Sequence, residues 1–72
     1  MKENLLNALA EQLKEQGSCA FKHQGQYYNV YFNEVDGYDY EIYESMDSCE
    51  PLQEATSCEV IDEREAILFA IL

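Results

Sequence analysis

The chain has 72 residues, of which 47% are hydrophobic, and its fifteen acidic and four basic side chains give a net charge of −11. This charge opposes direct binding to nucleic acid or to an anionic membrane, and it favours a basic protein as partner. No stretch approaches the roughly 20 apolar residues that span a membrane. The polar N-terminal segment is unlike a signal peptide, so we expect a single cytoplasmic domain.

The first element is an amphipathic helix over residues 3–16. Four leucines recur at helical spacing: Leu5, Leu6, Leu9 and Leu13. Gly17 follows the last turn, where a glycine commonly ends a helix in the left-handed conformation. We expect the leucine stripe to be the part of the core that the helix contributes.

Three strands follow, over residues 18–23, 27–34 and 38–44, rich in aromatic and β-branched side chains. A turn at Gln24-Gly25 would place Phe21 opposite Tyr28 and Cys19 opposite Val30. These strands predict a three-stranded antiparallel meander.

Two turns could join the second and third strands. A two-residue turn at Asp36-Gly37 places Phe32 opposite Glu41, which puts a carboxylate on the apolar face. A three-residue loop over residues 35–37, with Gly37 in the left-handed conformation, places Phe32 opposite Tyr40 and Val30 opposite Ile42. We prefer the second register because it separates the two faces of the sheet.

One face of the meander is then apolar and the other polar and aromatic. The apolar face carries Tyr28, Val30, Phe32, Tyr40 and Ile42. The other face carries Tyr27, Asn29, Tyr31, Asn33, Asp39, Glu41 and Tyr43. The helix can cover the apolar face, so the fold class is α+β.

The C-terminal part is less regular. Residues 45–57 contain Pro51 and have no clear period, which predicts an acidic loop, and residues 58–61 could form a short strand. Asp62 with Glu65 resembles a capping box and predicts a helix over residues 63–72. The apolar run over residues 66–72 also fits a buried strand, but the cap favours the helix.

Cysteine and histidine provide one candidate site. Cys19, His23, Cys49 and Cys58 have the composition of a structural Cys₃His zinc site, although they lack the paired CxxC spacing. The alternative is that the three thiols, an odd number, are free in a reducing compartment. No third residue is evident to orient His23 for cysteine catalysis, and nothing singles out an acid and base pair, so we expect no enzyme activity.

Acidic residues provide the other candidate site. Between Glu34 and Glu65 there are twelve carboxylates and one base, Arg64. Carboxylates mixed with tyrosines suit a basic, arginine-rich protein surface through ion pairs and cation–π contacts, although such acids can also serve only solubility. The candidate partner-binding residues are Glu34, Asp36, Asp39, Glu41, Glu44, Asp47 and Glu50, with Tyr31 and Tyr43 as anchors.

With its N-terminal helix, tyrosine- and acid-rich meander such as GYDYEIYE, and C-terminal helix, the chain resembles small acidic phage-encoded anti-CRISPR proteins. The resemblance covers most of the chain as a pattern, without a diagnostic motif. It implies a non-enzymatic, DNA-mimicking inhibitor that binds the positively charged channel of a single-effector RNA-guided nuclease and blocks nucleic-acid loading. The alternative is a small zinc-stabilised regulatory or accessory module of a mobile element.

Overall fold

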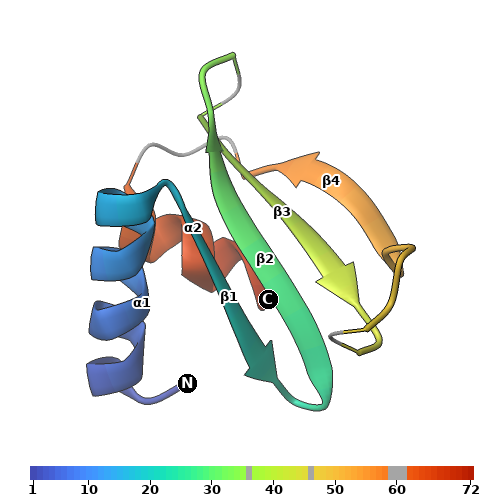
Figure 1. Cartoon of the computed structure of the whole chain (residues 1–72). Coiled ribbons are helices and arrows are strands. Elements are labelled where there is room, and N and C mark those ends of the chain that lie inside the picture. The colour runs from blue at the N-terminus through green and yellow to red at the C-terminus, as the bar shows by residue number, and fades with distance from the viewer. Residues whose placement is uncertain (36, 46, 59–61) are drawn as a thin grey trace.

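The computed structural model describes residues 1–35, 37–45, 47–58 and 62–72, and for residues 54–56 it describes the backbone alone. The order of elements is α1 (Glu3–Gln16), β1 (Ser18–His23), β2 (Gln26–Asn33), β3 (Gly37–Tyr43), β4 (Gln53–Ser57) and α2 (Glu63–Ala70). The strands form one antiparallel sheet in the order β1-β2-β3-β4, and both helices pack on one face of it (Figure 1). The α+β fold with a meander and two helices is therefore confirmed.

Helix α1 has the predicted bounds. Gly17 has a φ of 79°, and its N–H donates to the carbonyl oxygen of Leu13. Leu6, Leu9 and Leu13 are buried, but Leu5 is 48% exposed. The expectation that Leu5 belongs to the core was therefore wrong, because the inward stripe centres on the other three leucines.

The first hairpin has the predicted register, with Phe21 opposite Tyr28 and Cys19 opposite Val30. The second hairpin does not. Phe32 lies opposite Tyr38, and Val30 lies opposite Tyr40, two residues from the predicted pairing. The turn begins earlier than expected, because the side chain of Asn33 accepts a hydrogen bond from the N–H of Val35 at 2.9 Å.

The alternation of faces survives this correction, because a shift of two residues keeps each side chain on its side of the sheet. Tyr28, Val30 and Tyr40 are buried beneath the helices. Phe32, by contrast, is 52% exposed, since the end of the β2–β3 hairpin extends past both helices (Figure 1). Its ring meets that of Tyr38 edge-on, with 5.5 Å between centroids.

Strand β4 was missed, since residues 45–57 were predicted to be loop throughout. It pairs with β3 along the edge of the sheet, after Pro51, with a register shift between Tyr40 and Ile42. The N–H of Cys58 continues the contact, donating to the carbonyl oxygen of Tyr38 at 2.8 Å. Of the strand predicted over residues 58–61, residues 59–61 lie outside the described residues.

Helix α2 begins as predicted, with the side chain of Asp62 accepting a hydrogen bond from the N–H of Glu65 at 3.0 Å. It ends at Ala70, two residues before the predicted end. Ala66, Ile67 and Ala70 complete the core. In the described part of the chain, neither helix is long and apolar enough to cross a membrane.

Candidate partner-binding face

The face of the sheet turned away from the helices, the open face, carries side chains in rows across the strands. One row joins Lys22, Tyr27 and Tyr43. The next row joins Ala20, Asn29 and Glu41. Because paired residues on one face stand next to each other, these rows set which groups can act together.

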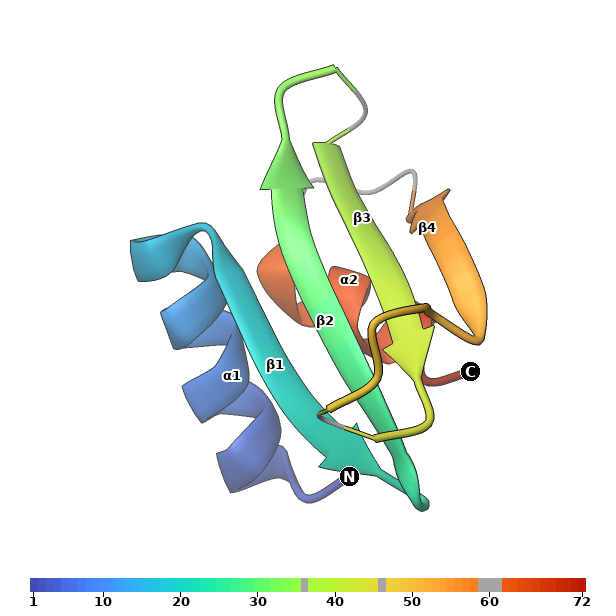
Figure 2. The same cartoon turned by 45° about the vertical axis from the view of Figure 1, so that its right-hand side comes forward.

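The loop between β3 and β4, residues 44–52, returns across this open face (Figure 2). Together with the strands it forms a pocket of about 520 Å³. From the strands, the residues of the two rows other than Glu41 line the pocket, and so do the core residues Phe21 and Tyr28. The loop contributes Ser45, Ser48 and Cys49. No local sequence pattern indicates this pocket, because it forms where the loop meets the sheet.

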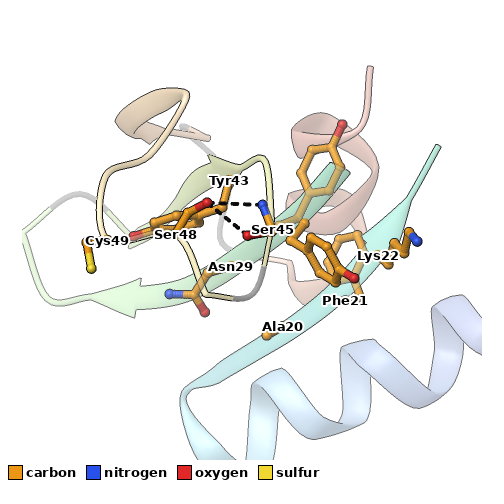
Figure 3. Close-up of a pocket in the computed structure, with 10 residues that line it drawn as sticks. Ala20, Phe21, Lys22, Asn29, Tyr43, Ser45, Ser48 and Cys49 are labelled. Atoms are coloured by element: carbon orange, nitrogen blue, oxygen red, sulfur yellow. Dashed lines mark hydrogen bonds between the residues drawn. The ribbon is translucent and has the colours of Figure 1, made fainter. Parts of the chain in front are cut away.

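Hydrogen bonds close the loop on itself beside Tyr43 (Figure 3). The Ser48 hydroxyl accepts from the N–H of Ser45 at 3.2 Å and lies 3.1 Å from the Ser45 hydroxyl. The N–H of Ser48 donates to the carbonyl oxygen of Ser45 at 3.2 Å. The serines therefore hold the loop in a tight turn at the pocket wall.

Glu41 is the carboxylate that lies next to the pocket. Its Oε2 accepts from the phenol of Tyr43 at 3.1 Å, and its Oε1 accepts from the side-chain amide of Asn29 at 3.4 Å. Burial, this hydrogen bond and the charge of Glu41 all raise the pKa of Tyr43, in that order. The carboxylate is thus held from two sides and stays partly exposed.

Asp39 does not belong to the exposed acidic surface, contrary to expectation. Its side chain is 5% exposed, and its Oδ2 accepts from the side-chain amide of Asn33 at 3.0 Å. Its Oδ1 is buried without a hydrogen-bond partner among the described residues. Asp39 is covered because β3 is an inner strand, where Tyr31 and Ser57 lie opposite it on either side.

The other predicted partner-binding residues divide by exposure. Glu34, at the end of the β2–β3 hairpin, and three acids of the 44–52 loop, Glu44, Asp47 and Glu50, are exposed. Tyr31 and Tyr43 are partly exposed on the open face. Asp36 lies outside the described residues.

The cysteines and the histidine are not brought together. Cys19 and Cys58 are buried, and the Cys58 thiol donates to the carbonyl oxygen of Ala66 at 3.8 Å. Cys49 is exposed in the loop, and His23 contacts the ring of Tyr28. Among the described residues, no three histidine, cysteine or acidic side chains are grouped as metal ligands.

Burial changes the acidity of the two core thiols. Burial raises the pKa of Cys19 from 9.0 to about 11. Burial and, to a lesser extent, the charge of Asp39 raise the pKa of Cys58 to about 11. Both thiols are therefore protonated at neutral pH in the folded chain.

Two of the four bases already have partners within the chain. Arg64 forms an ion pair with Glu3 at 3.0 Å, on the helical side of the molecule. The Lys22 ammonium lies 5.5 Å from the centroid of the Tyr27 ring, on the open face. The open face thus contains a cation–π contact within the chain, between Lys22 and Tyr27.

No protein-family model, no curated protein and no solved structure matches this chain. Its function must therefore be argued from the geometry and charge of the open face.

Proposed function

We propose that this chain is a non-enzymatic acidic inhibitor that binds a basic surface of a nucleic-acid-handling protein and blocks nucleic-acid loading. A CRISPR effector nuclease in the cytoplasm of a phage-infected cell is the first partner to test, given the resemblance to anti-CRISPR proteins. Such nucleases hold their heteroduplex in a positively charged channel.

The observation that carries the proposal is the position of the exposed carboxylates around the open face. Glu44, Asp47 and Glu50 lie in the loop that crosses one end of this face, and Glu34 lies in the hairpin at the other end (Figure 2). Exposed acids keep their charge available to a partner, and a surface of one sign steers a surface of the opposite sign into contact.

The acids can imitate the sign and spread of nucleic-acid phosphates. Same-face strand residues repeat at about 6.6 Å, whereas duplex DNA carries one charge per roughly 1.7 Å of axis. The protein therefore cannot reproduce the charge density of DNA, and its affinity must also come from shape and from aromatic contacts. The partly exposed Tyr31 and Tyr43 provide such contacts.

Charge reversal in the loop tests the proposal. The double variant Glu44→Lys with Glu50→Lys should lower affinity for a guide-loaded single-effector nuclease by at least about tenfold near 0.1 M salt. It should also reduce the salt dependence of binding. Affinity is measured by titration calorimetry, and inhibition by competition with target duplex DNA.

The matched control is Glu11→Lys with Glu15→Lys, which makes the same charge change on exposed positions of α1, away from the open face. This control should change affinity by less than about threefold. Equal losses in the two variants would show that only net charge matters, and absence of binding to basic nucleic-acid-handling proteins at low salt would refute the proposal. The zinc-stabilised module receives no comparable support, since no three of its candidate ligands are grouped among the described residues.

A further inference from the structure

We propose that the pocket between the sheet and the 44–52 loop binds one arginine side chain of the basic partner. This inference rests on the proposed function and specifies one contact between this chain and its basic partner. A guanidinium is a planar cation with five N–H donors, and it is best recognised by a carboxylate together with aromatic faces.

The carboxylate is that of Glu41, which adjoins the pocket. Each of its oxygens accepts one hydrogen bond from the chain, from Asn29 or from Tyr43. An ionised carboxylate has about four acceptor positions, so both oxygens can still accept from a guanidinium. Because Glu41 is already oriented, less side-chain entropy is lost when the cation binds.

The aromatic faces are those of Tyr27 and Tyr43, paired across β2 and β3 and both lining the pocket. Lys22 already lies over Tyr27, so this ring contacts a cation within the chain, and an arginine must share the ring with the lysine or displace it. Guanidinium stacks on aromatic rings more readily than ammonium, because it is planar and less strongly hydrated.

Ala20 has the smallest side chain in the two rows, and it leaves space in the pocket for the arginine side chain. Its neighbours on the open face of β1, Ser18 and Lys22, are larger, and all three are exposed. Across the pocket, Ser45 and Ser48 bring hydroxyl oxygens that can accept from N–H groups (Figure 3).

Charge around the pocket favours a cation over an anion. The exposed loop acids Glu44, Asp47 and Glu50 alternate along the chain with the lining residues of the loop, and Glu41 adjoins them. Against these four carboxylates the pocket has one base, Lys22, among its lining residues. Lys22 is the one lining residue that could pair with an anionic ligand. Its charge weakens the binding of an arginine, but the four nearby carboxylates outweigh it.

The test uses the folded chain and a single amino-acid derivative. N-acetyl-L-argininamide is titrated against ¹⁵N-labelled protein, with N-acetyl-L-citrullinamide as its neutral analogue of the same shape. The arginine probe should bind with a Kd on the order of millimolar, as expected for one small contact. It should shift the amide signals of Asn29, Tyr43, Ser45 and Ser48, and the citrulline probe should bind at least about tenfold more weakly.

Three variants sharpen the result. Ala20→Ile fills the pocket and should remove binding, while the matched Ser18→Ile, also exposed on β1 but outside the pocket, should leave it unchanged. Lys22→Gln should strengthen binding by about twofold, because it removes a neighbouring like charge.

The inference is overturned if both probes shift the same signals equally, if Ala20→Ile still binds, or if Lys22→Gln weakens binding.

The two proposals fail separately. If the arginine probe does not bind but the Glu44→Lys, Glu50→Lys variant still loses the nuclease, the pocket is wrong and the acidic surface stands. If the probe binds and that variant retains the nuclease, the pocket stands as a cation site and the proposed function is wrong.

Discussion

At the scale of single residues, position in the sheet outweighs residue type. Asp39 alternates with the apolar positions of β3 and so belongs to the polar face, yet it is buried because inner strands are flanked on both sides. A buried carboxylate oxygen without a hydrogen-bond partner costs free energy. Asp39 is therefore a site where the fold is less stable than it could be.

We predict that Asp39→Asn raises the free energy of unfolding by about 1 kcal/mol, because a neutral amide costs less to bury than a carboxylate that has a hydrogen-bond partner for only one of its oxygens. The amide oxygen can still accept from Asn33. Urea denaturation followed by circular dichroism measures the change. Asp47→Asn, at an exposed position, is the control and should stay within about 0.5 kcal/mol of the parent chain. A clear loss of stability in Asp39→Asn would show that its charge is compensated.

At the scale of elements, the two hairpins differ in how strictly the turn defines the register. Gln24 and Gly25 both have positive φ, 49° and 82°, as in a two-residue type I′ turn, so the register of the first hairpin follows from the turn. In the second hairpin the side chain of Asn33 starts the turn, and Gly37, with a φ of 92°, pairs with Asn33 inside the strand. This pairing brings Tyr43 beside Tyr27 and so shapes the pocket.

We predict that Gln24→Asn stabilises the protein by about 0.5–1 kcal/mol. Asparagine tolerates the left-handed conformation better than glutamine, and Asn-Gly is the preferred type I′ pair. The midpoint of urea denaturation should rise, with an unchanged dependence on denaturant. Gln26→Asn, exposed in the extended backbone of β2, should give no gain. Equal effects at both positions would contradict this account of the turn.

At the scale of the whole molecule, a small core joins both helices to the sheet through buried side chains that include two thiols. Cys19 on β1 and Cys58 after β4 are 2% and 1% exposed. Their pKa values rise from 9.0 to about 11 on folding. Ionising either thiol in place would bury a charge, so its ionisation is linked to global unfolding.

We predict that stability is lost as the pH rises from about 9 to about 11. In this window the unfolded chain releases its thiol protons while the folded chain keeps them. Across the whole window, each of the two thiols therefore lowers the free energy of unfolding by roughly 2–3 kcal/mol. Below pH 9 this contribution is fully present. Urea denaturation across pH 8–11 measures the slope. Cys58→Ala should reduce it and Cys49→Ser, at an exposed position, should not; an unchanged slope in Cys58→Ala would contradict the linkage.

Much of the fold could be predicted because its signals are local. The leucine stripe with Gly17 defined α1, the Asp62 cap defined the start of α2, and strict alternation separated the two faces of the sheet. Strand β4 could not be predicted, since its short polar sequence shows no alternation and becomes a strand only by pairing with β3.

The candidate site was predicted only in part. Sequence alone identified the acidic segment and Tyr43, because composition and period are visible along the chain. It could not identify Ala20, Ser45 or Ser48, whose role depends on the 44–52 loop lying across the open face. Nor could it show that Asp39 is buried, or that the described residues contain no group of three potential zinc ligands.

The sequence by itself thus determined the elements whose hydrogen bonds and caps involve near neighbours, together with the sign of the charge. The tertiary structure decided the edge strand, the pairing of Tyr27 with Tyr43, and the pocket beside Glu41. The reason is physical: these features depend on contacts between residues far apart in the chain, which no local preference encodes.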